Sequence, residues 1–137
     1  MLVNIHTAAL NGLEAVPILL ELNLSKGKDF FMVGLPDNAV RESRTRVMSA
    51  LENSGYPSRI NEVTVNFAPA DIRKEGSGYD LPLAVALLVA YRFANNDRLD
   101  TMMFVGELGL DGSLRPIKGI LPIAIEARRM GITDLIV

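Results

Sequence analysis

The chain has 137 residues, 49% of them hydrophobic and 22% charged, and its formal net charge is −2 at pH 7. This size and balance are typical of one globular domain with a hydrophobic core, and they do not indicate a nucleic-acid-binding or membrane-surface protein. The chain has no cysteine and a single histidine, His6, which excludes disulfides, thiolate metal sites and a histidine-based zinc site. Because no stretch has the length of a membrane span or the pattern of a signal peptide, we expect a cytoplasmic protein that does not contact a membrane.

The first third of the chain is predicted to form three strands. The first is Leu2 to Ala9, and Asn11-Gly12 after it is the commonest two-residue signal for a hairpin turn. The second arm runs from Ala15 to Leu24 with apolar residues at alternate positions, and Phe30 to Gly34 is the third strand. We expect these strands to form an antiparallel meander with one covered face.

A long helix is predicted from Asn38 to Asn53. Asp37 or Asn38 is its expected N-cap, and Gly55 is its stop signal. Glu42 and Arg46 are four residues apart, which favours an ion pair on the helix surface. The positions expected to be buried are Val40, Val47, Ala50 and Leu51.

The stretch from residue 63 to residue 90 is the centre of the predicted fold. Val63 to Phe67 alternates as a strand does, and Pro69 ends it. The charged loop from Asp71 to Tyr79 contains two glycines, and the helix from Asp80 to Tyr91 follows with Asp80 as its expected N-cap. Because this helix is apolar all round, we expect it to be buried. A loop held between a core strand and a core helix is where we expect a function.

The last third of the chain alternates strands with one amphipathic helix. The predicted order is a polar linker from Asn95 to Thr101, a strand from Met102 to Leu110, a hairpin signal at Asp111-Gly112, an extended segment from Leu114 to Ile117, a helix from about Leu121 to Met130 and a strand from Asp134 to Val137. The helix is expected to bury Ile123, Ile125, Ala127 and Met130. Gly106 and Gly109 are expected to mark a bulge or a close backbone approach. A final strand that reaches the last residue favours a domain of a longer protein.

Three segments carry a resemblance to a known family. They are VGLPDNAVRES at residues 33 to 43, VNFAPADIRKEGSGYDLPLAVAL at residues 65 to 87 and FVGELGLDGSLRPIKGILPIAI at residues 104 to 125. In them the chain resembles the N-terminal domain of the magnesium-chelatase-like AAA+ ATPases, the ComM/YifB group, a domain that is in turn similar to the proteolytic domain of Lon protease. The resemblance implies an α/β (α+β) two-layer sandwich of the Lon-protease type, like domain two of ribosomal protein S five. It also implies that residues 1 to 137 are one N-terminal domain of a longer AAA+ protein.

The family's motor is not found in this sequence. A P-loop needs glycines that end in Gly-Lys-Ser/Thr, and no such run occurs, so we expect that ATP does not bind to this chain. We likewise expect no other cofactor and no metal in it. The resemblance implies that ATP and magnesium bind to an ATPase module after residue 137. It further implies a homo-hexameric parent protein, with the rest of its own chain and DNA as partners. The implied role is that of a non-catalytic accessory domain, which assists assembly or guides the substrate of an ATPase acting in DNA recombination, branch migration and competence.

Lon protease hydrolyses peptides with a serine that a nearby lysine activates. When Lys74-Glu75-Gly76 is aligned with the Lys-Asp-Gly of Lon, the serine position falls on Gly78. When Pro116-Ile117 is aligned in the same way, the lysine position falls on Leu121. Both members of the dyad are therefore replaced, and we expect no enzymatic activity.

Two other functions stay open. One is a serine hydrolase or peptidase with a rearranged dyad of Ser77 and Lys118, and the other is a regulatory protein-binding module. For nucleic acid, the candidate contacts to phosphates are Arg41, Arg44, Arg73 and Lys74. A solvated face is the simpler interpretation of these cations given the negative net charge, and Asp71 and Glu75 beside them favour local ion pairs over a metal site.

Overall fold

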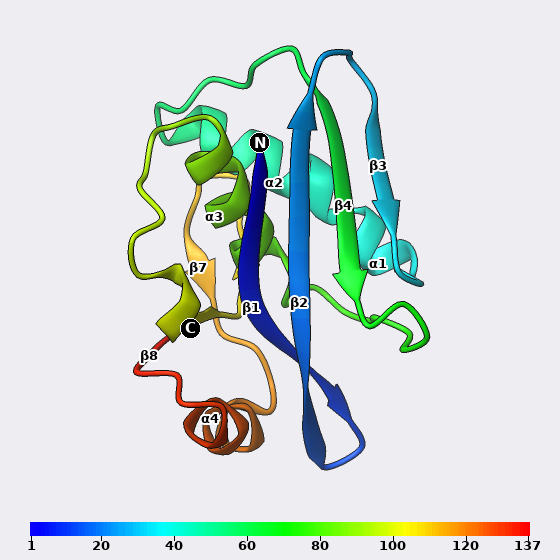
Figure 1. Ribbon diagram of the computed structural model, residues 1–137, viewed down its shortest axis with the longest axis vertical. Helices are drawn as coiled ribbons and strands as arrows, with labels where there is room; N and C mark the ends of the chain where they lie inside the picture. Colours follow the sequence, from blue (N-terminus) through cyan, green and yellow to red (C-terminus); the bar gives the residue numbers. More distant parts are fainter.

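The computed structural model describes all residues from Met1 to Val137. Six strands form one mixed sheet in the order β3-β4-β2-β1-β5-β8, and β6 pairs with β7 in a separate hairpin (Figure 1). The strands are β1 (Leu2–Asn11), β2 (Glu14–Ser25), β3 (Phe30–Val33), β4 (Glu62–Ala68), β5 (Met102–Phe104), β6 (Glu107–Leu108), β7 (Leu114–Arg115) and β8 (Asp134–Ile136). The helices are α1 (Asn38–Arg41), α2 (Ser43–Asn53), α3 (Asp80–Ala90), the 3-10 helix η1 (Leu99–Thr101) and α4 (Ile120–Arg129). The predicted mixed α/β class is confirmed, and none of these helices is long and apolar enough to cross a membrane.

Strands β1 and β2 form the predicted hairpin. Their antiparallel pairing runs from Leu2 opposite Asn23 to Asn11 opposite Glu14. The two loop residues are Gly12 and Leu13, so the turn lies one residue later than the Asn11-Gly12 signal suggests. Gly12 has a φ of +64°, which a glycine adopts without steric cost.

The predicted three-stranded meander is wrong. β3 does not pair with β2 but lies parallel to β4, and β4 pairs antiparallel with β2. The burial of the two strands explains this order. β4 buries every second residue, whereas β3 has only four residues and exposes Phe31 and Val33, so β4 occupies the interior of the sheet and β3 its edge.

One face of the sheet carries the main hydrophobic core. Alternate residues of β1, β2 and β4 point to this face, and α2 and α3 cover it, as they lie behind the sheet in Figure 1. The core contains 22 buried residues. Eight of the eleven residues of α3 are buried, which confirms the predicted buried helix, and the four predicted positions Val40, Val47, Ala50 and Leu51 are buried as well.

Helix α4 packs against the other face of the sheet. Its buried residues are Ile123 and Ala127, which join Ala8, Met103 and Val105 in a second, smaller core. Side chains alternate along β1, so Ala8 lies on the face opposite to that of Thr7. The prediction that Ile125 and Met130 are buried is wrong, since 59% of Ile125 and 36% of Met130 are exposed. Only a narrow stripe of α4 faces the sheet, and it consists of Ile123 and Ala127, which are four residues apart and therefore lie on the same side of the helix.

Two predicted elements are each divided. The helix expected from Asn38 to Asn53 is interrupted at Glu42, although Asp37 caps it as predicted, its Oδ1 accepting from the Val40 N–H at 2.8 Å. The strand expected from Met102 to Leu110 is broken at Val105-Gly106, and the hairpin around Asp111-Gly112 follows as predicted.

Gly106 shows why the strand breaks. Its N–H donates to the Gly78 carbonyl at 2.9 Å, and its own carbonyl accepts from the Leu81 N–H at 3.0 Å. A Cβ atom at this position would lie 2.3 Å from Cδ1 of Leu114. The predicted close backbone approach at Gly106 is thus confirmed, and it ties the chain after β5 to the start of α3.

Candidate functional site: a cleft beside the start of helix α3

Asp80 is the first residue of α3, and its side chain is completely buried. Its carboxylate accepts hydrogen bonds from Ser43 Oγ at 2.6 Å, from Arg46 Nε at 2.7 Å and Nη2 at 3.0 Å, and from the Leu108 N–H at 3.0 Å. These bonds supply the partners that a buried carboxylate needs. The hydrogen bond that Arg46 donates to Asp80 also raises the pKa of Arg46, so its guanidinium stays protonated.

The prediction that Asp80 caps α3 is wrong. Tyr79 occupies the N-cap position, and no side-chain hydrogen bond caps the helix. The reason is that the carboxylate of Asp80 accepts its hydrogen bonds from residues of α2 and β6, and none from the amides of its own helix. The network fixes the start of α3, and with it the loop that precedes the helix.

Lys74 holds the other end of that loop. Its side chain is fully buried, and its Nζ donates to the Gly34 carbonyl at 2.7 Å and to the Pro69 carbonyl. The backbone of Lys74 bonds to the residues on both sides of Pro36. The Lys74 N–H donates to the Leu35 carbonyl, and the Asp37 N–H donates to the Lys74 carbonyl, each at 3.0 Å. Burial lowers the pKa of Lys74, while Asp71 opposes the shift. The prediction of Lys74 as a surface cation for nucleic acid is therefore wrong, because its ammonium is enclosed by carbonyl groups.

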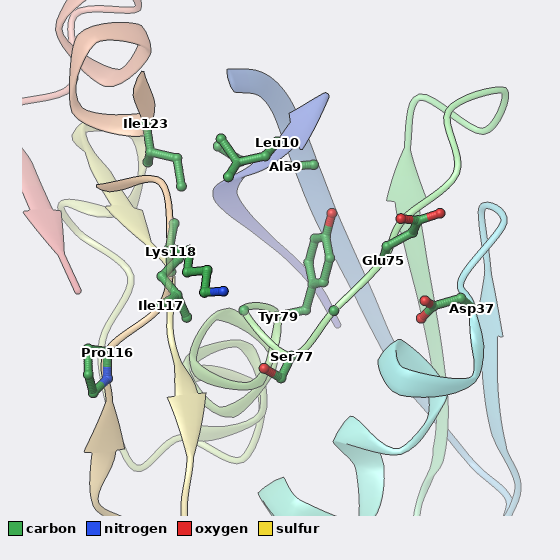
Figure 2. A pocket seen from close by; sticks show the side chains of 14 residues that line it. Ala9, Leu10, Asp37, Glu75, Ser77, Tyr79, Pro116, Ile117, Lys118 and Ile123 are labelled. Atoms are coloured by element: carbon green, nitrogen blue, oxygen red, sulfur yellow. The ribbon is translucent and has the colours of Figure 1, made fainter. Parts of the chain in front are cut away.

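A cleft of about 630 Å³ opens beside the loop between these two anchors (Figure 2). Its volume lies in the range that is typical of small-ligand sites. The end of β1, the loop before α3 and the loop before α4 form its walls. The lining residues are Ala8–Leu10, Asp37, Glu75–Tyr79, Val105, Pro116–Lys118 and Ile123.

Tyr79 forms part of the wall of this cleft. Only 2% of the residue is exposed, its ring packs edge-on against Phe67 with centroids 5.3 Å apart, and its hydroxyl has no hydrogen-bond partner in the protein. Burial raises the pKa of Tyr79, and the nearby carboxylates of Asp37 and Glu75 raise it further. The phenol therefore keeps its proton and can donate it in a hydrogen bond. Our sequence reasoning missed Tyr79, although an aromatic residue between a glycine-rich loop and a buried helix is a usable signal.

The structure places Ser77 and Lys118 in the same cleft. Ser77 comes from the loop before α3 and is half-buried, whereas Lys118 extends from the loop before α4 and is exposed (Figure 2). No hydrogen bond joins Ser77 to Lys118. Of the two positions aligned with the Lon dyad, Gly78 lines the cleft, while Leu121 is 71% exposed and lies outside its lining.

The remaining candidate cations are on the surface. Arg41 and Arg44 are exposed, and the guanidinium of Arg44 lies 4.9 Å from the centre of the Phe30 ring. Arg73 is exposed and forms an ion pair with Glu75 at 3.3 Å, which is the local pairing predicted for this segment. Three of the four predicted nucleic-acid contacts thus remain accessible to a ligand.

Comparison with known proteins places the chain in a family. Residues 20–137 match the family described as subunit ChlI of Mg-chelatase. The chain is 47% identical over 128 residues to YifB of Escherichia coli (strain K12), an alignment that covers 93% of this chain and 25% of that protein. It is 39% identical over 126 residues to the competence protein ComM of Haemophilus influenzae, covering 91% of this chain and 25% of ComM. The chain spans about a quarter of the length of these relatives. It belongs to the family of the ChlI subunit of Mg-chelatase, together with YifB and ComM.

Proposed function

We propose that this chain is a non-catalytic accessory domain of a larger ComM/YifB-like ATPase that acts on DNA. It would be the single N-terminal, Lon-like domain of that protein, and it would assist assembly or guide the substrate during branch migration and recombination. The relative ComM is named as a competence protein, which supports a role with incoming DNA. In this proposal ATP, magnesium and the contacts of a homo-hexamer belong to the longer protein outside these 137 residues.

The main observation behind the non-catalytic role is the missing contact between a nucleophile and its base. A serine nucleophile needs a base within hydrogen-bond reach, and no hydrogen bond joins Ser77 to Lys118. The positions aligned with the Lon dyad are Gly78 and Leu121, neither of which can supply the chemistry.

A serine hydrolase is the second candidate, because Ser77 and Lys118 line the same cleft. The two candidates differ in their reaction with a fluorophosphonate, which labels activated serines. We expect no labelling of the chain. Covalent labelling of Ser77 that is abolished in Lys118→Ala would establish the hydrolase and reject the non-catalytic role. Lys26→Ala is the matched control, since it removes an exposed lysine that is outside the cleft.

A further inference from the structure

Two buried hydroxyl groups of this protein have no hydrogen-bond partner, those of Thr7 and Tyr79. Only Tyr79 lines the cleft. A buried hydroxyl without a partner is unfavourable, and native structures rarely leave one without a reason. The position of Tyr79 in the cleft therefore points to a polar ligand that completes the hydrogen bond.

The loop beside Tyr79 offers further donors. The backbone N–H groups of residues 75 to 79 donate no hydrogen bond to any other group in the protein. They immediately precede α3, an eleven-residue helix whose N-terminus favours a negative group. Gly78 lies next to Ile117, with the position of a Cβ 3.7 Å from Ile117 Cδ1, so this part of the loop adjoins the segment that carries Lys118.

The charges of the cleft are separated. Lys118 extends from one side and has no ion-pair partner in the protein, whereas Asp37 and Glu75 lie on the other side of Tyr79 (Figure 2). Glu75 forms an exposed ion pair with Arg73, while Asp37 has no ion-pair partner. Both carboxylates act on the Tyr79 hydroxyl, since both raise its pKa. A ligand that fits this distribution carries a positive group at one end and a negative group at the other.

We propose that the cleft binds a small zwitterion whose amine and carboxylate lie at opposite ends, such as a short peptide. Its protonated amine would face Asp37 and Glu75, its carboxylate would face Lys118 and the free amides, and Tyr79 would hydrogen-bond to it between them. Leu10 and Ile123 supply apolar walls for the body of such a molecule. This site is separate from the proposed action on DNA, and either proposal can fail without the other.

The first experiment titrates the ¹⁵N-labelled chain with 6-aminohexanoate, which carries an amine and a carboxylate on a flexible apolar spacer. Hexanoate and hexylamine are matched probes that each lack one charge. We expect saturable shifts of the amides of Gly76, Gly78 and Tyr79 with 6-aminohexanoate, and binding about tenfold weaker with either matched probe, because each loses one charge-assisted contact. Shifts that rise without saturation, or equal binding of all three probes, would overturn the proposal.

The two unpartnered hydroxyls, of Tyr79 and Thr7, allow a variant and a matched control. Tyr79→Phe removes the hydroxyl in the cleft and keeps the ring, and Thr7→Val removes the other unpartnered hydroxyl, which lies outside the cleft. Neither change breaks a hydrogen bond of the protein, so both variants should fold. We expect Tyr79→Phe to weaken binding of 6-aminohexanoate by about tenfold and Thr7→Val to leave it unchanged. Wild-type affinity in Tyr79→Phe would show that the hydroxyl does not contact a ligand.

Charge variants test the orientation of the zwitterion. Asp37→Asn removes a negative charge but keeps an oxygen that can cap α1, and Lys118→Gln removes the positive charge of an exposed residue. We expect Asp37→Asn to weaken 6-aminohexanoate and hexylamine but not hexanoate. Lys118→Gln should weaken 6-aminohexanoate and hexanoate but not hexylamine. The opposite pattern, or no effect of either change, would reject the site.

The spacing of the two charges is tested with leucine and the dipeptide Ala-Leu. Saturable binding of Ala-Leu supports the proposal, and leucine, whose amine and carboxylate share one carbon, should bind more weakly. Tighter binding of leucine than of Ala-Leu would reject a ligand with charges at opposite ends. N-acetylated Ala-Leu amide lacks both charges and should not bind. Binding of the capped dipeptide as tight as that of the free one would overturn the zwitterion proposal.

Discussion

The Nε atom of Arg46 lies 2.7 Å from Oδ2 of Asp80, and this pair joins helix α2 to the first turn of α3. Asp80 is fully buried, while the side chain of Arg46 is 21% exposed. Removing one member of a buried pair leaves an uncompensated charge, which costs far more than losing an exposed pair. The two partners of Arg46 allow a direct comparison of these cases.

We predict that Asp80→Ala lowers the free energy of unfolding by about 3–5 kcal/mol, because Arg46, Ser43 and the Leu108 N–H lose their common acceptor. Urea denaturation followed by circular dichroism measures the loss. The matched control is Glu42→Ala, which removes the other partner of Arg46, an exposed carboxylate 3.6 Å away. It should cost only about 0–1 kcal/mol. Similar losses in the two variants would contradict a structural role of the Asp80 network.

The buried ammonium of Lys74 gives a second prediction. Lys74→Ala removes the donor to the carbonyls of Gly34 and Pro69 and leaves a void beside the loop. We expect a loss of about 2–4 kcal/mol in the free energy of unfolding. Lys26→Ala, at an exposed position in the β2–β3 turn, should change it by no more than about 0.5 kcal/mol. If Lys74→Ala behaved like Lys26→Ala, the enclosed position of Lys74 would be wrong.

Tyr79 should make stability depend on alkaline pH. Its pKa is raised in the folded protein, so the unfolded chain releases the phenolic proton from about pH 10 while the folded protein retains it. The folded state then binds more protons, and stability falls as pH rises, by up to about 1.4 kcal/mol per pH unit for this group. Tyr79→Phe lacks this contribution. We expect the variant to gain stability relative to wild type between about pH 9 and pH 11 in parallel urea titrations. A constant difference across this range would contradict the burial of the hydroxyl.

Two glycines with positive φ should differ sharply in their response to alanine. A Cβ at Gly34 would lie 2.4 Å from the backbone carbonyl oxygen of Phe67, whereas a Cβ at Gly55 has no atom within 4 Å. We expect Gly55→Ala to lower the free energy of unfolding by about 1–2 kcal/mol, because alanine is disfavoured in the left-handed conformation of this position. Gly34→Ala should cost about 3 kcal/mol or more, since strands β3 and β4 must also separate. Thermal unfolding of both variants tests this order.

The DNA proposal also makes a prediction for this chain alone. With Lys74 enclosed, three candidate cations remain, and three phosphate contacts give a log-log salt slope of at most about −2.7 on duplex DNA. We expect little or no binding of labelled single-stranded or duplex DNA at about 0.15 M salt, because only avidity in an assembly would make so small a footprint effective. Tight, saturable binding that survives reversal of Arg41 and Arg44 to Glu would show that both the strength and the surface are wrong.

Local patterns predicted most of the elements but not the partners of β3 or Asp80. Alternation and helical spacing found the buried residues of β4 and α2, because these patterns depend on neighbours in the chain. The position of β3 at the sheet edge depends on β4, which follows about thirty residues later and is the better buried strand. A capping rule assigned Asp80 to its own helix, whereas Ser43 and Arg46 from α2 compete for the same carboxylate.

Only one wall of the cleft was predictable from the sequence, because the other features depend on contacts between distant parts of the chain. The loop from residue 71 to residue 79 was the expected place for a function, and it does form one wall. The enclosure of Lys74 was missed because a lysine in a charged, glycine-bearing segment carries no sign of burial, and only the fold brings the Gly34 and Pro69 carbonyls to its ammonium. The unpartnered hydroxyl of Tyr79 likewise depends on the packing of Phe67 and the strands around it.

The division of the interior into two cores has a consequence for motion. The core under α2 and α3 has 22 buried residues, whereas the core under α4 has five. Elements with less buried apolar area open more often than the rest of a protein, so α4 and β8 should exchange their amide hydrogens well before α3 does. The Lys118 wall of the cleft belongs to the segment that leads into α4, while the Tyr79 wall is anchored to the larger core. The cleft would then widen by local opening on one side only, with the loop before α3 fixed as the other side moves.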